Sequence, residues 1–168
     1  KGIPIIGELE LAYQTVAGSQ LRIKGDTNNE KPGIRSAETA TPHFIGITGT
    51  NGKSTVTTLV DIILKKAGFR TLLGGNIGYA LTEEILKAIS GEQSAGTKKL
   101  RADFIVAEIS SFQLETIDKF RPKIAAILNV TPDHLDRYEN MDDYIGAKAR
   151  IFENQLAGDV LVLNADDP

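Results

Sequence analysis

The sequence of 168 residues contains no cysteine. The chain therefore forms no disulfide and offers no thiolate to a metal, which excludes disulfide-stabilised domains and cysteine zinc sites. Long hydrophobic runs are also missing, because no stretch approaches the about 18 consecutive apolar residues of a membrane-spanning helix. We expect a protein of a reducing, cytoplasmic compartment that works without a membrane.

Neither sign of charge dominates the sequence. With 19 Lys and Arg against 22 Asp and Glu, the formal net charge is −3. No basic stripe is present, which argues against a general nucleic-acid-binding protein. The composition, 41% hydrophobic and 24% charged, is typical of a globular domain, and the length suffices for one domain with a substantial core.

Both ends of the sequence indicate a piece of a longer protein. It begins Lys1-Gly2-Ile3-Pro4, with neither an initiator Met nor the features of a signal peptide. It stops at Asp166-Asp167-Pro168, directly after an apolar run. We therefore expect that further domains belong to the complete protein.

Short apolar runs alternate with segments of helical spacing. The predicted strands are residues 44–48, 71–75, 104–109, 123–129 and 160–163. The predicted helices are residues 53–67, 81–91 and 141–154. This alternation predicts an α/β fold, a mostly parallel sheet flanked by helices, in which ligands bind beyond the carboxyl ends of the strands.

Residues 15–42 differ from the rest of the chain, because Gly, Asn, Thr, Ser, Glu and Lys dominate and no period is sustained. We expect a surface excursion or mobile linker there. Within it, residues 21–24 are a candidate hairpin arm. Residues 91–101 are predicted to form a second polar loop.

A glycine-rich run stands between the first predicted strand and the first predicted helix: Gly49-Thr50-Asn51-Gly52-Lys53-Ser54-Thr55. Such a turn directs backbone N–H groups and a helix N-terminus at one point, which attracts phosphate. Lys53 would add a mobile positive charge, and the Ser54 hydroxyl is placed to ligate magnesium. The general P-loop pattern has glycine where this chain has Ile47. A corner that merely needs glycines is the alternative, but the flanking pattern favours phosphate binding.

Glu108 interrupts an apolar predicted strand. A buried carboxylate needs a cation or hydrogen-bond donors, so an acid at this strand end suggests a magnesium ligand beside the phosphate site. An acid at the solvent edge, paired with Lys or Arg, is the alternative. The neighbouring glycine-rich run favours the metal.

Other polar candidates follow the remaining strands or lie on the last helix. His134 is a candidate ligand for a metal or a polarised carboxyl group, with Asp133 as the partner that fixes its tautomer. Lys148 has small neighbours on a predicted helix, so it is a candidate to point inward, although its composition alone favours a surface lysine. Asn76, at a strand-to-helix turn, would hold an anionic substrate or serve only the turn.

Five ordered motifs together resemble the Mur ligase family. They are residues 46–55, 74–78, 108–115, 129–138 and 148–154, and residues 7–11 and 164–167 also fit. The unusual P-loop of this family accounts for Ile47. The runs Ser-Ser-Phe-Gln and Asp-His-Leu-Asp-Arg-Tyr resemble the D-glutamate-adding member more than its siblings.

The resemblance implies a P-loop NTPase-like central domain, here incomplete, that uses ATP and two Mg²⁺ ions. Lys53 and the amides of residues 49–55 would bind the phosphates, and Ser54 and Glu108 would hold one Mg²⁺. His134 and Lys148 would serve the second Mg²⁺, with Lys148 carbamylated by carbon dioxide. The residues implied to contact UDP-N-acetylmuramoyl-L-alanine are Asn76, Ser110, Gln113 and His134.

The implied reaction joins D-glutamate to UDP-N-acetylmuramoyl-L-alanine through an acyl phosphate, with Lys53, His134 and Lys148 as catalytic residues. Residues 1–14 would be the tail of an N-terminal UDP-binding domain, residues 15–43 a linker, and residues 44–168 part of the ATP-binding domain. A C-terminal domain is absent, so we expect the isolated chain to be inactive and the full-length protein to be a monomer. Another Mur ligase, a folylpolyglutamate synthase and a non-catalytic nucleotide-binding module are the alternatives.

Overall fold

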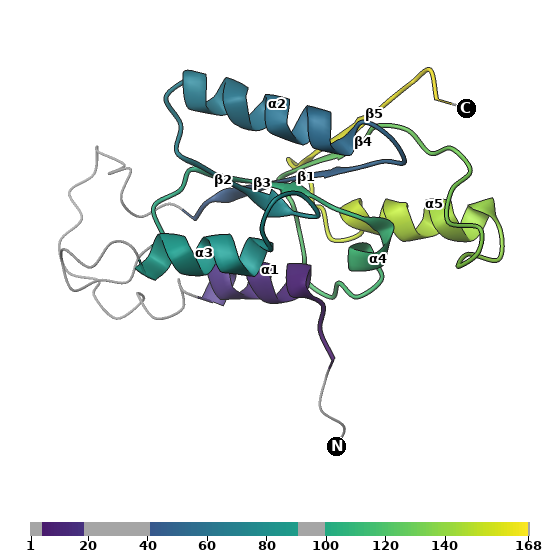
Figure 1. Cartoon of the computed structure of the whole chain (residues 1–168), viewed down its shortest axis with the longest axis horizontal. Helices are drawn as coiled ribbons and strands as arrows, with labels where there is room; N and C mark the ends of the chain where they lie inside the picture. The colour runs from purple at the N-terminus through teal and green to yellow at the C-terminus, as the bar shows by residue number, and fades with distance from the viewer. Residues whose placement is uncertain (1–4, 19–40, 91–99, 168) are drawn as a thin grey trace.

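The computed structural model describes residues 5–18, 41–90 and 100–167, which contain one five-stranded sheet in the order β2-β3-β1-β4-β5 (Figure 1). All four strand pairings are parallel. The strands are β1 (His43–Thr48), β2 (Thr71–Gly75), β3 (Phe104–Glu108), β4 (Ile124–Ile127) and β5 (Val160–Leu163). The predicted α/β class with a mostly parallel sheet is confirmed.

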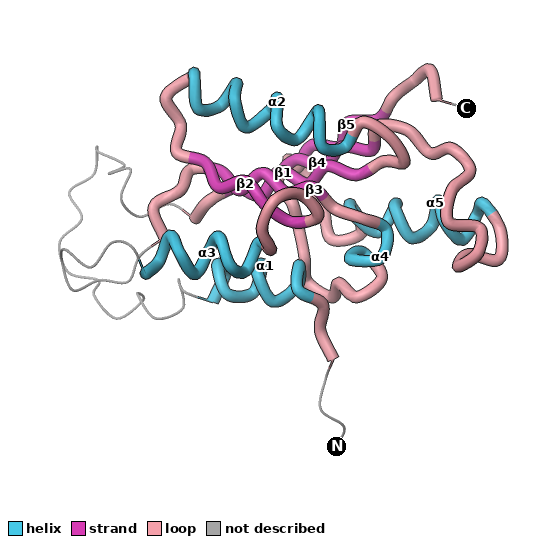
Figure 2. Tube along the Cα trace, in the orientation of Figure 1, coloured by secondary structure: helices cyan, strands magenta, loops and turns pink. Residues whose placement is uncertain are grey.

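The helices cover both faces of the sheet. Helix α2 lies over one face, and α1, α3, α4 and α5 lie over the other (Figures 1 and 2). The helices are α1 (Glu8–Gly18), α2 (Lys53–Lys66), α3 (Leu81–Ser90), α4 (Ser111–Leu114), α5 (Met141–Ala149) and the 3₁₀ helix η1 (Arg150–Phe152). Within the described part of the chain, no helix is both long and apolar enough to span a bilayer.

Alternating residues of the central strand build two cores. In β1, Phe44 packs with residues of α1 and α3, whereas Ile45 and Ile47 pack toward Val56 and Val60 of α2. Successive side chains of a strand point to opposite faces, so a strand covered on both sides needs apolar residues throughout. This explains why the predicted strands appeared as continuous apolar runs.

Two predicted elements are longer than the observed ones by more than one residue. The predicted strand 123–129 contains only Ile124–Ile127 as strand, because Asn129 leaves the ladder and bonds to residues 50 and 51. The predicted helix 141–154 ends at Ala149 and continues as η1. At that point Arg150 donates to the carbonyl oxygens of Glu115 and Ile117, which draws the last turn toward the loop after α4.

The predicted linker begins too early and ends too late. Residues 15–18 form the last turn of α1, and His43 is the first residue of β1. Leu9, Ala12 and Val16 are buried at helical spacing against the sheet, and this period crosses the predicted boundary. Residues 19–40, with the candidate hairpin arm, and residues 91–99 of the second polar loop lie outside the described residues.

A buried glutamate fixes α1 to the rest of the domain. Glu10 is fully buried, and its carboxylate accepts the backbone N–H groups of Asp118, Lys119 and Phe120 at 3.0, 3.1 and 2.9 Å. Gln14 Nε2 donates to the same carboxylate at 2.6 Å. Burial acts to raise the pKa of Glu10, but these hydrogen bonds together hold the pKa below its ordinary value.

We expect Glu10→Gln to lower the free energy of unfolding of the chain by about 1–3 kcal/mol at pH 7, because an amide leaves converging N–H donors unpaired. The folded-state pKa of Glu10 is depressed, so its carboxylate stabilises the fold above the unfolded-state pKa of about 4.3 and loses this effect as pH falls. Urea unfolding followed by circular dichroism measures both effects. The matched change Glu83→Gln, on the exposed side of α3, should alter stability by less than about 0.5 kcal/mol. Equal losses of unfolding free energy in the two variants would contradict the stabilising role of the Glu10 carboxylate.

Candidate functional site

The glycine-rich run forms the turn between β1 and α2, which we call the P-loop (residues 49–55). Gly52 has φ of +80°, which favours glycine, and it directly precedes the first residue of α2. No side chain caps this helix end. The first-turn N–H groups of α2 therefore remain available to an anion. Lys53 Nζ lies over the loop and donates to the carbonyl oxygen of Thr50 at 2.9 Å.

Asn129 holds the P-loop from the end of β4. Its carbonyl oxygen accepts the N–H of Thr50 at 2.9 Å, and its side-chain oxygen accepts the N–H of Asn51 at 2.8 Å. Its amide nitrogen donates to the carbonyl oxygen of Asn51 at 3.1 Å. The N–H groups of Thr50 and Asn51 are thus already used, which leaves the phosphate-binding donors to the beginning of α2. Sequence reasoning noticed the motif of Asn129 but missed this contact.

Glu108 ends β3 beside the last residues of the neighbouring strands. It is 2% exposed and in register with Ile47 of β1 and Gly75 of β2. Its Oε1 accepts a hydrogen bond from Asn76 Nδ2 at 3.1 Å, and its Oε2 is buried without a partner among the described residues. The alternative of an exposed acid paired with Lys or Arg is wrong. A buried carboxylate with a free oxygen fits a divalent cation.

The unpaired buried groups gather at one edge of the sheet. In the described residues, the buried side-chain polar atoms without a partner are Glu108 Oε2 and Thr48 Oγ1. These two residues end β3 and β1, so both atoms lie at the carboxyl ends of neighbouring strands. Asn76 also follows the carboxyl end of its strand, β2, and its N–H donates to the carbonyl oxygen of Glu108 at 2.8 Å.

Lys148 points inward from α5. It is 2% exposed, and its Nζ donates to the carbonyl oxygen of Gly49 at 3.0 Å and lies 4.4 Å from the ring centroid of Tyr144. Of the two alternatives for Lys148, the structure shows the inward orientation and not the surface position that composition alone favoured. Burial and, to a smaller extent, the charge of nearby Lys53 lower the pKa of Lys148 to about 8, and Asp133 opposes the shift. A larger share of this amine is therefore neutral at neutral pH than of a surface lysine.

His134 lies on the loop after β4 with its side chain 43% exposed. Its ring centroid is 4.9 Å from that of Phe112 and 6.1 Å from that of Tyr144. Asp133 is close, with its Oδ2 at 3.6 Å from His134 Nε2. Within residues 5–18, 41–90 and 100–167, no three His, Cys, Asp or Glu side chains gather to form a ready metal centre. The second metal with His134 therefore stays a prediction.

Ser110 and Gln113 form a capping box at the start of α4. Ser110 Oγ accepts the N–H of Gln113 at 3.3 Å, and Gln113 Oε1 accepts the N–H of Ser110 at 3.0 Å. The spacing Ser-x-x-Gln is a known signal of this cap, so the sequence could have revealed it. Gln113 Nε2 takes no part in the box and is the atom of this pair that suits a ligand oxygen.

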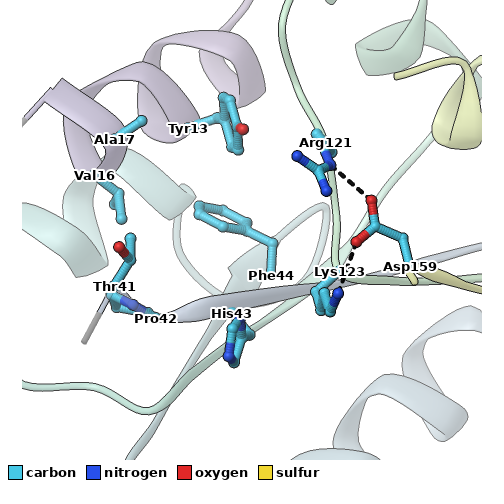
Figure 3. Close-up of a pocket in the computed structure, with 10 residues that line it drawn as sticks. All are labelled: Tyr13, Val16, Ala17, Thr41, Pro42, His43, Phe44, Arg121, Lys123 and Asp159. Carbon is cyan, nitrogen blue, oxygen red and sulfur yellow. Dashed lines mark hydrogen bonds and ion pairs between the residues drawn. The ribbon is translucent and has the colours of Figure 1, made fainter. Parts of the chain in front are cut away.

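Figure 3 shows a pocket of about 380 Å³. Its lining residues include the first two residues of β1, His43 and Phe44, so it lies at the end of the strands opposite to the P-loop. Tyr13 and Phe44 line it, and across from them Arg121 Nε and Lys123 Nζ contact the Asp159 carboxylate at 2.6 and 2.9 Å (Figure 3). The hydrogen bond from Arg121 holds the pKa of Asp159 far below its usual range. Lys123 precedes β4 and Asp159 precedes β5, so this cluster joins two strands at their amino ends.

A protein-family model described as the Mur ligase middle domain matches residues 47–168. The chain is 46% identical to UDP-N-acetylmuramoylalanine--D-glutamate ligase of Pelotomaculum thermopropionicum over 168 residues, which is 100% of the chain and 29% of that ligase. It is 47% identical to the ligase of the same name from Koribacter versatilis over 99% of the chain and 29% of the relative. The chain thus spans less than a third of the length of these relatives.

Solved structures agree on the fold. One is a UDP-N-acetylmuramoyl-L-alanyl-D-glutamate--2,6-diaminopimelate ligase, 25% identical with a TM-score of 0.54, covering 75% of this chain and 27% of that one. Another is E. coli FolC in complex with DHPP and ADP, 16% identical with a TM-score of 0.53, covering 99% of this chain and 48% of that one. The second likeness concerns the fold alone. The match of the middle-domain model to residues 47–168, together with relatives that are nearly half identical, shows that this chain belongs to the Mur ligase family.

Proposed function

We propose that the chain is the ATP-binding part of a cytoplasmic ligase that joins D-glutamate to UDP-N-acetylmuramoyl-L-alanine during peptidoglycan precursor synthesis. The names of relatives 44–53% identical to the chain support this substrate pair. Folylpolyglutamate synthase fits less well, because structures of that type are 16–17% identical. The observation that carries the proposal is the buried, half-satisfied carboxylate of Glu108 beside an uncapped P-loop helix.

The chain's own residues supply an anion site and a cation site side by side. The amides at the beginning of α2 and the Lys53 ammonium would bind the terminal phosphates of ATP. The Ser54 hydroxyl and Glu108 Oε2 would hold Mg²⁺, and Asn76 keeps the Glu108 carboxylate oriented from its other oxygen. When bound, Mg²⁺ would offset the repulsion between ATP and an attacking carboxylate.

The proposed chemistry has two steps. The substrate carboxylate attacks the γ-phosphorus of ATP, so that a new O–P bond forms, ADP leaves and an acyl phosphate results. The amine of D-glutamate then attacks the acyl carbon, loses a proton, forms the amide and releases inorganic phosphate. Asn76, Gln113 and His134 would contact the muramoyl substrate, together with Ser110 from the same cap as Gln113.

Lys148 is proposed to act after modification. Its neutral amine would form an N–C bond with carbon dioxide and release one proton to solvent, which converts a cation into a carbamate anion. The lowered pKa supplies the neutral amine, and the contact with Gly49 keeps the nitrogen beside the P-loop. The carbamate and His134 would serve a second Mg²⁺.

We further propose that residues 44–168 are part of the central domain of the full-length protein. Helix α1 crosses the expected boundary after residue 14 and buries Leu9 and Val16 in the same core, so it belongs to this domain and not to the tail of an N-terminal one. The D-glutamate-binding residues then lie in parts of the full-length protein outside this chain. The full-length protein, a monomer in this proposal, is expected to release ADP with D-glutamate as acceptor, and the isolated chain to show no turnover. A coupled ADP assay with a panel of amino acids tests this. Equal rates with other amino acids, or ligation by the isolated chain, would contradict it.

Lys53→Met is expected to weaken Mg·ATP binding by the 168-residue chain at least about tenfold, because the variant loses a charge-assisted phosphate contact. Isothermal titration calorimetry measures the affinity. Lys66→Met, in the last turn of the same helix, removes an equal charge at the opposite end and should leave binding unchanged. If the unaltered chain did not bind Mg·ATP, or if the two variants bound it with equal affinity, the proposal that Lys53 and the P-loop bind the phosphates would be wrong.

In ¹³C-bicarbonate, we expect the chain to show a carbamate ¹³C resonance that Lys148→Arg abolishes and Lys66→Arg retains. The signal should grow as pH rises from about 6.5 to 8.5, because the neutral fraction of an amine with a pKa of about 8 increases through that range. In the full-length protein, Lys148→Ala should lower kcat at least about 100-fold. Unchanged activity of this variant would refute the two-metal proposal.

A further inference from the structure

We propose that Glu115 is a positioning residue that fixes His134 at the edge of the site through Arg137 and Tyr138. The proposal rests on the proposed function only for the importance of His134. The contacts that carry it are independent of any reaction. Neither the sequence motifs nor the proposed chemistry assigns a role to Glu115.

His134 has an unfavourable backbone conformation. Its φ of +54° is the only positive value of a non-glycine residue in the described part of the chain. A left-handed conformation is unfavourable for a residue with a Cβ, so surrounding contacts must hold it. The carbonyl oxygen of His134 accepts the N–H groups of Arg137 and Tyr138 at 3.0 and 3.1 Å, which closes a single turn.

One carboxylate binds both residues that close this turn. Arg137 donates through its terminal nitrogen to Glu115 Oε2 at 2.5 Å and through Nε to Oε1 at 3.3 Å. The Tyr138 hydroxyl donates to Glu115 Oε1 at 2.6 Å. The hydrogen bond from Arg137 holds the pKa of Glu115 below its ordinary value, so the carboxylate is charged at neutral pH. Glu115 therefore fixes the C-terminal end of the His134 turn at two points.

Glu115 is itself held on the frame that carries Glu108. It directly follows α4, which begins three residues after Glu108, and its carbonyl oxygen accepts a hydrogen bond from Arg150 at 2.6 Å. From the same helix, Phe112 lies with its ring centroid 4.9 Å from the His134 ring and 4.6 Å from the Arg137 guanidinium carbon. The position of the His134 turn is thus fixed relative to the end of β3, where the candidate metal ligand Glu108 lies.

Loss of Glu115 should release the turn while the fold persists. The Arg137 and Glu115 side chains are 53% and 30% exposed, so their removal opens no core cavity. Without the carboxylate, the left-handed conformation of His134 has less support, and its ring is free to leave Phe112. The P-loop makes none of these contacts, so ATP binding should not change.

The test compares Glu115→Ala with Glu139→Ala, a control that removes an exposed glutamate next to Tyr138. In NMR spectra of the 168-residue chain, Glu115→Ala should abolish the nuclear Overhauser contacts between the His134 and Phe112 rings, and Glu139→Ala should retain them. In the full-length protein, Glu115→Ala should lower kcat about tenfold with an unchanged KM for ATP. Glu115→Gln, which keeps an acceptor for Tyr138, should lower kcat less than Glu115→Ala does.

Retained ring contacts and an unchanged kcat in Glu115→Ala would overturn the proposal, and so would an equal loss in Glu139→Ala. Arg137→Gln removes the other partner of the contact and should reproduce the loss if Glu115→Ala fails to fold. His134→Ala distinguishes the proposed role of His134 in the reaction from the proposed role of Glu115 in positioning it. If His134→Ala keeps full kcat, the proposed role of His134 fails. The His134–Phe112 ring contacts in Glu115→Ala still decide whether Glu115 positions the turn.

Discussion

A buried carboxylate with one unsatisfied oxygen, at the end of β3, is the constraint on which the site depends. The carboxylate of Glu108 receives a single hydrogen bond, from the Asn76 side chain, and its other oxygen has no partner in the described residues. Such a group destabilises a fold by itself, because desolvation of a charge is offset only by a cation or several donors. Fully satisfied buried groups elsewhere, such as the carboxylate of Glu10 in α1, contribute the stability that permits this arrangement. The structure thus has an acceptor suited to a cation at the point where its sheet meets the P-loop.

Parallel topology brings the three relevant loops together, and polar side chains then fix them to one another. The loop after β4 holds the P-loop through Asn129, and the turn after β2 holds Glu108 through Asn76. The helix after β3 holds the turn of His134 through Glu115. The first two contacts join segments at the carboxyl ends of neighbouring strands of the sheet, and the third joins the segments that follow β3 and β4. A substitution in one loop is therefore expected to act on a residue of another, which a residue-by-residue view of the motifs would miss.

Local patterns predicted the strands and the P-loop, because burial and turn chemistry leave signals within a few residues. Composition alone favoured a surface position for Lys148, which is buried. The features that sequence reasoning missed depend on distant partners. Asn129 and Asn51 are 78 residues apart, and nothing in either segment alone indicates that one clamps the other. Helix α1 was not predicted at all, because the polar composition that follows it outweighed the spacing of Leu9, Ala12 and Val16. The positive φ of His134 has no sequence signal of the kind that glycine provides.

The environment of Lys148 disfavours its protonated form relative to that of a surface lysine. A protonated Lys148 would place a second positive charge near Lys53 and would repel any divalent cation bound beside the P-loop. The carbonyl oxygen of Gly49 and the face of Tyr144 stabilise the ammonium only in part, and burial still lowers the pKa to about 8. A lysine that only packed a helix against the sheet would be better replaced by an apolar residue of similar length. If the neutral amine reacts as proposed above, its conversion into an anion turns repulsion of the metal into attraction.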